Sequence, residues 1–362
     1  MTVDTIWKLE PHGQAKHEIL RGYLRAWFPI MASWQGRVVY LDGFAGPGIY
    51  EDGEPGSPII ALETLMTHDG VDLQAGTEFI FVFMEEDEER CIRLAEQVGI
   101  LFDRLGGKPP KVVVEIENTR FEEGVKQILE QLEGKEVAPT FAFVDPFGWS
   151  GAPMDVMADL LRPRCELLFT FIYDQTSRFI SINNEKVIQQ LEDLFGSDDF
   201  KQAVDLSGTD RKEKLLELFT FQLRDQIGFE FVNSFEMINS KGRTPYFLIH
   251  ATYHQKGAEK IKDVLWGLDP TGEFRYSSRL AGQDVLFAEK AEVDPLILAM
   301  QNKFASQTVT IADVESFVIR DTPYRKPHVR EALRALESED QIEVSGRTRR
   351  RTYPSGTTIK FP

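Results

Sequence analysis

The sequence predicts an α/β fold in which a doubly wound, mostly parallel sheet with a helical insertion is followed by a C-terminal winged helix. Three apolar runs carry this prediction, at residues 38–41, 79–84 and 140–144, and each run stops at an acidic residue. Runs of this length that are rich in β-branched and aromatic residues are typical of buried parallel strands. Helical periodicity fills the chain between the runs, so strands and helices alternate as they do in a doubly wound sheet.

The acids that end these runs are Asp42, Glu85 and Asp145. In open α/β sheets ligands bind beyond the carboxyl ends of the strands. We therefore expect the three carboxylates to lie along one edge of the sheet and to line one site. The alternative is that acids follow these strands only because strands commonly end at polar residues. That explanation is sufficient for one such ending but less so for three.

The first strand follows an expected N-terminal helical arm, residues 1–35, with helical periodicity over residues 5–35. Its apolar side is formed by Ile19, Tyr23, Leu24, Trp27, Phe28 and Ile30. Lys16 and His17 fall on the polar side, where we expect contact with solvent. Beyond the glycine turn, Ser57 as N-cap and Pro58 at the first helical position predict the start of the next helix.

The remaining elements continue the alternation as far as a sheet domain spanning residues 36–290. Strands are expected at 111–116 and 166–172, and helices at 87–98, 121–132 and 154–161. Residues 174–226 are helical in pattern and predict an inserted cap. Two further strands, 229–238 and 245–253, are joined by a short polar turn. They predict an antiparallel hairpin that completes a seven-stranded sheet.

The last domain, residues 294–362, has the pattern of a winged helix. Helices are expected at 295–305, 311–320 and 327–339, and strands at 341–344 and 357–361. Arg330 and Arg334 are four residues apart and share one face of the third helix. Arg349 and Arg350 belong to the basic loop between the two strands. Such a domain can enter the major groove of DNA, or it can serve in protein docking or dimer formation.

The charge of the chain is uneven. The formal net charge is −17, yet residues 295–362 hold 11 lysines and arginines against 8 aspartates and glutamates, a net +3, which leaves −20 on the rest. A strongly acidic chain does not coat nucleic acid indiscriminately. The basic terminal domain therefore makes local nucleic-acid contact possible without predicting it.

Cysteine usage and hydropathy indicate the compartment. Cys91 and Cys165 follow no metal-ligand spacing and form no disulfide framework, which suits a reducing cytoplasm. No apolar run approaches the roughly 18 residues of a membrane span, and the first twelve residues lack the apolar core of a signal peptide. We expect a cytoplasmic protein with no membrane segment and no metal site.

The glycine turn at 43–48 excludes two common nucleotide sites. A dinucleotide fingerprint opens directly into a helix and has an acid about 20 residues further on, whereas here a polar loop separates the turn from the next helix. A P-loop requires Gly-Lys-Ser or Gly-Lys-Thr after its glycines. That sequence is absent, so neither a nicotinamide, a flavin nor a P-loop nucleotide is expected.

Three stretches together resemble the motifs of class I S-adenosylmethionine-dependent methyltransferases. They are Asp42-Gly43-Phe44-Ala45-Gly46-Pro47-Gly48, Glu85, and Asp145-Pro146-Phe147-Gly148. Within that class the chain is similar to the three-Cys-motif partner protein family, TcmP. That similarity extends over most of the chain and includes Glu10-Pro11-His12, Lys16-His17-Glu18-Ile19-Leu20, Gly56-Ser57-Pro58 and the basic winged helix.

The resemblance implies a cofactor, S-adenosylmethionine, and residues that hold it. Those residues are Asp42, Gly43, Phe44, Gly46, Gly48, Glu85, Asn118 and Phe121. The glycines would let the backbone pass the methionine part, with Asp42 near its amino group. Glu85 would accept both ribose hydroxyls, which suits the two oxygens of a carboxylate. Asn118 and Phe121 would lie at the adenine.

The resemblance also implies an acceptor site at Asp145, Pro146 and Phe147. In methyltransferases that act on an exocyclic amine, an Asp or Asn, two prolines and an aromatic residue hold a flipped-out base. Here Phe147 replaces the second proline, Gly148 replaces the aromatic residue, and Trp149 follows. Trp149 is a candidate stacking face or a packing residue, and Arg178 is a candidate for a phosphate or a surface ion pair.

Three functions follow from these features. The first is methyl transfer to DNA or RNA, at a base amine, with Arg330, Arg334, Arg349 and Arg350 binding the nucleic acid. The second is methyl transfer to a protein, including the three-cysteine partner that the family resemblance implies. The third is a non-catalytic module that keeps the cofactor site for assembly or sensing.

Overall fold

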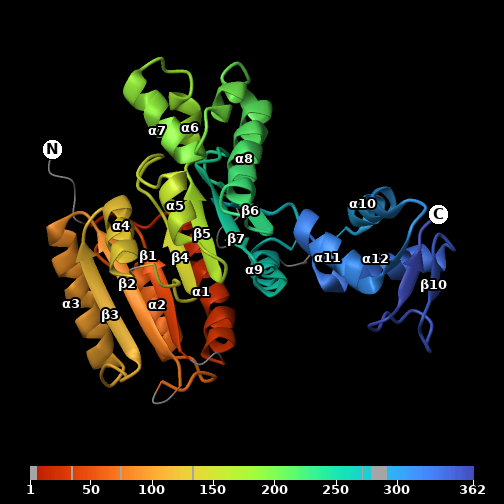
Figure 1. The fold of residues 1–362 in the computed structure, drawn as a ribbon, viewed down its shortest axis with the longest axis horizontal. Helices are drawn as coiled ribbons and strands as arrows, with labels where there is room; N and C mark the ends of the chain where they lie inside the picture. The colour runs from red at the N-terminus through yellow and green to blue at the C-terminus, as the bar shows by residue number, and fades with distance from the viewer. Residues whose placement is uncertain (1–5, 34–35, 74–75, 133, 271, 279–291) are drawn as a thin grey trace. The chain divides into compact units, whose positions relative to one another are not determined.

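The computed structural model describes residues 6–33, 36–73, 76–132, 134–270, 272–278 and 292–362. They fall into two compact units (Figure 1). The first contains the described residues up to Tyr253 together with 276–278, and the second contains 254–275 and the residues from 292 onward. Helix α9 (Gln255–Leu268) thus belongs to the second unit by its contacts, although the sequence pattern places it in the sheet domain.

The first unit contains an eight-stranded sheet in the order β3-β2-β1-β4-β5-β7-β6-β8. Its strands are β1 (Arg37–Asp42), β2 (Glu78–Glu85), β3 (Val112–Asn118), β4 (Thr140–Val144), β5 (Cys165–Phe171), β6 (Phe231–Ile238), β7 (Tyr246–Thr252) and β8 (Arg275–Ser277). The first five are parallel, and β7 runs antiparallel to both β5 and β6. The expected hairpin is confirmed, and the short strand β8 extends the seven expected strands.

The register aligns the strand ends that the sequence singles out. Asp42 lies opposite Phe83 of β2 and Phe143 of β4, so β1 ends between its neighbours. Glu85 pairs with Asn118 at the ends of β2 and β3. The strand order reverses between β1 and β4, and a doubly wound sheet opens its ligand crevice at that reversal.

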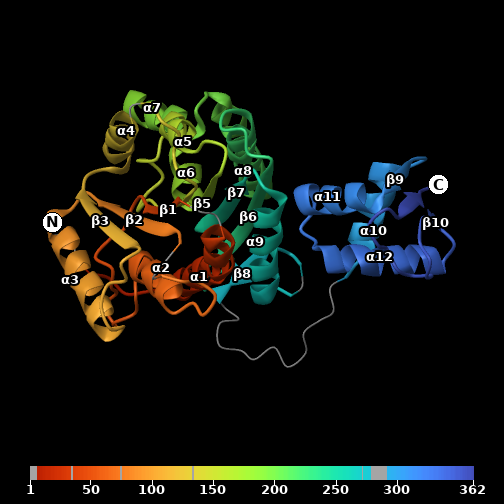
Figure 2. The same ribbon diagram turned by 60° about the horizontal axis from the view of Figure 1, so that its bottom comes forward.

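Helices cover both faces of this sheet, as Figure 2 shows. One layer contains α1 (Pro11–Ala32), α2 (Ser57–Met66) and α3 (Glu88–Arg104). The other contains α4 (Phe121–Gln131), α5 (Met154–Leu160), α6 (Tyr173–Phe179), α7 (Glu185–Phe195) and α8 (Gly208–Asp225), with a 3₁₀ turn at Asp199–Ala203. The last three helices and the turn form the helical insertion that the sequence predicts.

Helix α1 packs directly on the sheet. It begins at Pro11, six residues later than expected, because proline fits the first turn of a helix and Glu10 before it is extended. Its Tyr23 ring stacks on Phe141 of β4 at 5.3 Å. The prediction of a solvent-exposed polar side was wrong at two positions, since Lys16 and His17 are only 9% and 7% exposed.

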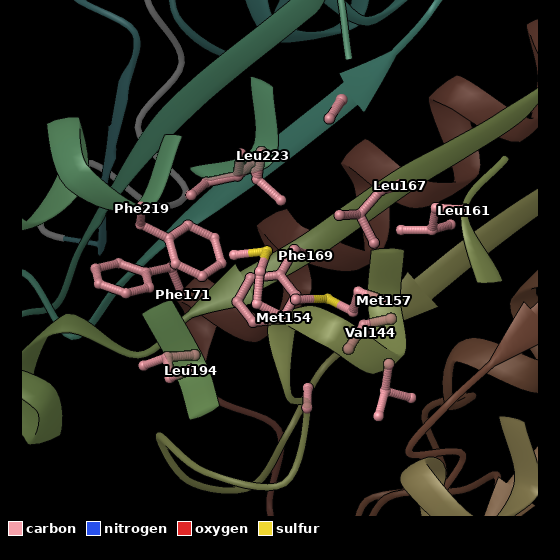
Figure 3. Close-up of a cluster of buried hydrophobic side chains, with 14 of the residues drawn as sticks. Val144, Met154, Met157, Leu161, Leu167, Phe169, Phe171, Leu194, Phe219 and Leu223 are labelled. Atoms are coloured by element: carbon pink, nitrogen blue, oxygen red, sulfur yellow. The ribbon is translucent and has the colours of Figure 1, made fainter. Parts of the chain in front are cut away.

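The opposite face of the sheet carries the larger apolar core (Figure 3). Phe169 and Phe171 of β5 stack on Phe219 of α8, with ring centroids 5.0 and 4.7 Å apart. Met154 and Met157 of α5 fill the space beside them. These contacts bind the helical insertion to the sheet as part of one core.

The second unit contains the winged helix. Its elements after α9 are α10 (Asp294–Phe304), β9 (Thr308–Thr310), α11 (Ile311–Asp321), α12 (Lys326–Ser338), β10 (Glu343–Ser345) and β11 (Thr358–Lys360). The three helices and two wing strands are confirmed. Strand β9 was not expected, and it completes a three-stranded sheet in the order β10-β11-β9. A separate apolar core, which includes Trp266 of α9, holds the unit together.

Candidate active site

The glycine turn that follows β1 is shaped by close contacts. Gly46 and Gly48 have φ angles of +62° and +74°, which side chains disfavour. Gly43 does not have a positive φ. A side chain is excluded there for another reason, because a Cβ atom on Gly43 would lie 2.5 Å from the ring of Phe121. The adjacent Phe44 stacks on the same ring at 5.7 Å.

Asp42 lies beneath this turn and is fully buried. Burial raises the pKa of its carboxyl to about 7, while hydrogen bonds from the Ser57 hydroxyl and the Phe44 N–H oppose the rise. Ser57 thus bonds to Asp42, and Gly56 occupies the N-cap position that the sequence assigned to Ser57. Asp42 lines neither of the cavities described below, so its contacts support the turn from within the protein.

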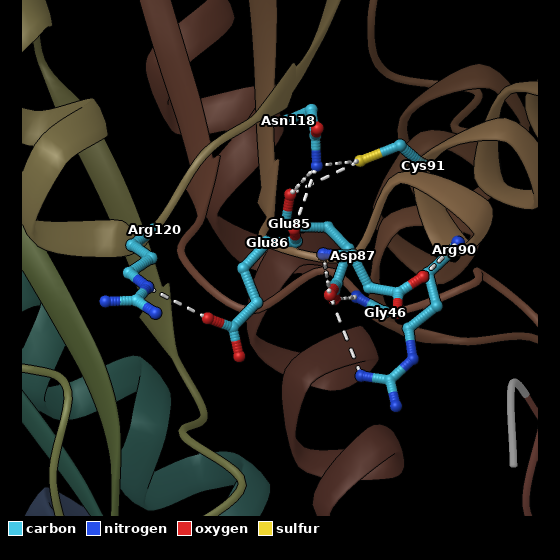
Figure 4. A network of polar contacts seen from close by, with 8 residues as sticks. All are labelled: Gly46, Glu85, Glu86, Asp87, Arg90, Cys91, Asn118 and Arg120. Atoms are coloured by element: carbon cyan, nitrogen blue, oxygen red, sulfur yellow. Dashed lines mark hydrogen bonds and ion pairs between the residues drawn. The ribbon is translucent and has the colours of Figure 1, made fainter. Parts of the chain in front are cut away.

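Glu85 holds the other side of the turn (Figure 4). Its carboxylate accepts the Gly46 N–H at 2.9 Å and the Asp87 N–H at 3.0 Å, and Arg90 Nη1 lies 3.7 Å away. Burial raises the pKa of Glu85 despite these partners. A carboxylate has about four lone-pair positions, so these contacts leave acceptor capacity on the cavity side.

Asn118 has a different place from the one expected. Its side-chain amide donates to the backbone oxygens of Glu85 and Glu86, both at 3.0 Å, and also to the Cys91 sulfur (Figure 4). It therefore joins the ends of β2 and β3 and lines neither of the two cavities described below. Phe121, at the start of α4, does line one.

Two cavities lie at this edge of the sheet, and the larger of the two has a volume of about 430 Å³ and lies beyond the ends of β1, β2 and β3. Glu85 and Phe121 line it on the sheet side. Gln190, Asp193 and Leu194 of α7 line it on the other side. The helical insertion therefore supplies part of its wall, a role that helical periodicity alone does not indicate.

A smaller cavity of about 170 Å³ lies beside the first, and the two share Phe44 and Phe147. Its lining includes Gly46, Pro47, Gly48, Gly56, Ser57, Asp145, Pro146 and Thr170. Lys16 of α1 forms an ion pair with Asp145 in this cavity. The Lys16 ammonium also lies 5.3 Å from the centre of the Tyr246 ring.

Aromatic side chains from distant segments close the smaller cavity. Trp7, which precedes α1, packs edge-on against Tyr50 and Phe147 at 6.0 and 5.1 Å. The guanidinium of Arg90 lies 5.2 Å from the rings of both Trp7 and Phe147. Phe147 is nevertheless 55% exposed, which leaves part of its ring open beside Asp145.

Two candidate residues of the first unit lie away from both cavities. Trp149 is buried and stacks on Phe179 at 5.6 Å, so its ring belongs to the core. Arg178 is exposed and pairs with Asp174 one helical turn earlier at 3.0 Å. In this conformation the packing interpretation holds for Trp149 and the ion-pair interpretation for Arg178.

The arginines of the winged helix differ in exposure and partners. Arg347 binds Glu337 of α12 with two hydrogen bonds of 2.8 and 2.6 Å, and these bonds lower the pKa of Glu337 to about 2. Arg350 approaches the same carboxylate at 3.3 Å but is 71% exposed. The partners and exposure of the other three candidates are as follows: Arg330 pairs with Glu315 at 3.4 Å, Arg334 contacts the backbone oxygen of Arg351, and Arg349 is exposed.

Comparisons with known proteins identify the terminal domain. Residues 275–349 match the family model described as a GMT-like wHTH domain, which agrees with the winged helix of the second unit. No curated protein sequence matches the chain.

Two solved structures show weak similarity. Precorrin-6y C5,15-methyltransferase from Geobacter metallireducens GS-15 is 11% identical, with 64% of this chain and 87% of that chain covered and a TM-score of 0.30. A protein described as a possible exported protein from Bordetella parapertussis is 10% identical, with 65% and 67% covered and a TM-score of 0.29. Superpositions this loose carry no argument about fold or activity.

The cavities themselves fit the cofactor that the motifs imply. They are contiguous, they lie at the reversal of strand order, and the glycine turn between them has room for no side chain at Gly43. Within the described ranges, no three metal-ligating side chains are placed to hold an ion, and no helix is long and apolar enough to cross a membrane.

Proposed function

We propose that this protein is a methyltransferase that uses S-adenosylmethionine and acts on nucleic acid, at a base amine held beside Asp145. One observation carries the proposal. Two contiguous cavities meet at the glycine turn where the strand order reverses, the larger lined by Glu85 and the smaller by Asp145.

The two cavities together have groups suited to the cofactor and to the acceptor. In the larger cavity Glu85 is suited to accept the ribose hydroxyls, and Phe121 to contact the adenine. Bound S-adenosylmethionine would supply an electrophilic methyl group. The contribution of the protein is then to align the acceptor with that methyl group, which requires no nucleophilic side chain.

The acceptor side is proposed from Asp145 and Phe147. The Asp145 carboxylate can accept one N–H of an amine, which orients the nitrogen lone pair toward the methyl group. The half-exposed ring of Phe147 offers a stacking face for a base. Pro146 lies between these two residues in the chain, and all three line the smaller cavity.

Nucleic acid is the proposed substrate because of the winged helix. The exposed arginines 334, 349 and 350 form a basic surface on α12 and the wing loop, and a GMT-like wHTH match covers most of that domain. Arg330 extends the surface along α12. Membership of the TcmP family and a three-cysteine protein partner belong to this proposal as well, on the motifs quoted above.

Calorimetric titration of S-adenosylmethionine and S-adenosylhomocysteine tests the cofactor. We expect the wild type to bind both and Glu85→Ala to lose roughly 1.5 to 3 kcal/mol, the scale of a hydrogen bond to a charged group. Glu85 also holds Gly46 and Asp87, so Glu85→Gln provides a variant that keeps one acceptor oxygen. Glu89→Ala, exposed on the first turn of α3, is the control.

Transfer of a labelled methyl group tests the substrate. We expect label in DNA or RNA, and we expect Asp145→Ala to abolish transfer while the variant still binds the cofactor, because the substitution removes the group that accepts from the amine. Label in protein alone would replace the nucleic-acid substrate by a protein. No cofactor binding by the wild type would overturn the proposal.

A further inference from the structure

We infer that Lys16 of α1 binds the α-carboxylate of S-adenosylmethionine, so that the smaller cavity receives the amino-acid end of the cofactor. The inference rests on the proposed function and adds to it a binding residue from outside the glycine turn and the strand ends. It starts from the way the two cavities are joined.

The glycine turn borders both cavities, with Gly43 and Phe44 lining the larger one and residues 44–48 lining the smaller one. The Gly46 N–H bonds to Glu85, which lines the larger cavity, and Gly46 itself lines the smaller one. A ligand whose ribose reaches Glu85 therefore continues past Gly46 into the smaller cavity. The part of S-adenosylmethionine that follows the ribose is an amino acid with one ammonium and one carboxylate group.

The smaller cavity has one cation suited to that carboxylate. Among the described residues that line it, the charged side chains are Lys16 and Asp145, and the others are aromatic, aliphatic, hydroxyl-bearing or glycine. Arg90 is close by, but it lies between Trp7 and Phe147 and lines neither cavity. Lys16 is therefore the side chain that can neutralise an anion there.

The surroundings of Lys16 favour a strong bond. Its side chain is 11% exposed, and charge-assisted hydrogen bonds gain strength where water is excluded. An ammonium group has three N–H donors, and the described hydrogen bond uses one of them on Asp145. Lys16 can thus bind a second carboxylate while it keeps Asp145 in place.

The smaller cavity has a second polar group with hydrogen-bonding capacity to spare, the hydroxyl of Thr170. The Thr170 hydroxyl is buried at the wall of the smaller cavity, and no protein group in the described part of the chain accepts from it or donates to it. Buried hydroxyls normally have a partner. An amino-acid end bound at Lys16 would bring polar atoms into the space that Thr170 borders.

The test compares two ligands that differ by one group. S-adenosylhomocysteine has the carboxylate, whereas 5′-S-(3-aminopropyl)-5′-thioadenosine lacks only that group. We expect the wild type to prefer the first by roughly 10- to 100-fold, the range for a hydrogen bond between charged groups. Lys16→Met should remove this preference by weakening S-adenosylhomocysteine alone. Lys8→Met, an exposed lysine paired with Asp52, should leave both affinities unchanged.

The outcomes separate this inference from the proposed function. Equal affinity of the wild type for the two ligands overturns the inference without any variant, and so does an equal loss of both ligands in a folded Lys16→Met protein. Binding of neither ligand by the wild type overturns the proposed function and this inference with it. If Lys16→Met does not fold, Lys16→Gln and the wild-type preference decide the matter.

Discussion

Both units bury a lysine, but they surround it differently. In the first unit Lys16 pairs with one carboxylate at the wall of a cavity. In the second unit Lys262 of α9 is completely buried, and its ammonium donates to four backbone oxygens near the end of α11. Those oxygens belong to Val318, Ile319, Thr322 and Tyr324.

The difference in partners indicates that Lys16 is suited to bind a ligand and that Lys262 stabilises the fold. The last carbonyls of a helix have no partner within the helix, and the helix dipole makes this end negative. Lys262 satisfies these carbonyls and binds α9 to the winged helix, which leaves no donor for a ligand. Lys16 keeps donors beside a cavity, so removing its charge should affect a ligand more than the fold.

The largest effect is expected from Lys262→Met. The substitution removes a donor from four buried carbonyls, and a buried acceptor that is left unsatisfied costs about 1 to 3 kcal/mol. Hydrogen exchange at the α11 amides, measured in the full chain, should show a corresponding loss of protection in the second unit. Exchange in the first unit should not change.

A neighbouring lysine on α9 is the control for this prediction. Lys260 is partly exposed and pairs with Asp263 at 3.6 Å, and exposed pairs of this kind contribute about 0 to 1 kcal/mol. Lys260→Met should therefore keep the exchange pattern of the wild type. Full protection of α11 in Lys262→Met would show that the carbonyls find other partners and would remove the contrast between the two lysines.

The next effect concerns His17, the neighbour of Lys16 in α1. Burial, with a smaller contribution from the Lys16 charge, lowers the pKa of His17 to about 3. In the unfolded state His17 becomes protonated near pH 6.5, whereas in the folded state it stays neutral at that pH. The contribution of neutral His17 to the free energy of unfolding is therefore fully present above pH 6.5 and is lost as the pH falls toward 3. Between pH 7 and 5 the loss is about 2 kcal/mol at 1.36 kcal/mol per pH unit.

Urea denaturation of the wild type and His17→Gln across this pH range measures the effect. The variant should be less dependent on pH, whatever its stability at pH 7. Lys16→Met should show an intermediate dependence, because the neighbouring positive charge is gone while the burial remains. Parallel pH curves for the wild type and His17→Gln would mean that His17 is accessible to protons in the folded protein.

The sequence predicts the strand ends that line both cavities, but not the side chains that other segments bring to the smaller one. Glu85 and the glycine turn follow apolar runs, and the ends of parallel strands must meet at one edge of the sheet. Trp7, Lys16, Tyr50 and Tyr246 come together only through the packing of α1, the loop after β1 and strand β7. The local periodicity of apolar residues does not predict contacts between segments that are distant in the sequence.

For Lys16 and His17 the helical pattern gave the wrong prediction, which was exposure to solvent. The aromatic rows of α1 determine which side faces the sheet, and the pattern assigns the remaining residues to solvent. In the structure the first turns of α1 also pass the end of β4, where Asp145 pairs with Lys16. The adjacent Lys16-His17 pair within the first turns of α1 was the available signal, and a charged partner at a strand end was needed to interpret it.

The smallest effect is expected on the wing, where a buried and an exposed arginine lie two residues apart. Arg347 is held by Glu337, so Arg347→Ala should destabilise the wing by leaving that buried carboxylate short of donors. Arg349 is exposed, so Arg349→Ala should keep the fold. If Arg349 contacts a phosphate, its loss weakens nucleic-acid binding a few-fold and lowers the slope of log K against log salt by about 1.

Binding titrations at several salt concentrations, with Lys303→Ala of α10 as the control, measure this slope. A smaller slope of log K against log salt for Arg349→Ala than for the control would place a phosphate at the wing. The wing would then show the same contrast as the two lysines, between a charge that stabilises the fold and a charge that binds a ligand. An identical slope in both variants would mean that Arg349 contacts no phosphate, because each lost phosphate contact lowers the slope by about 1.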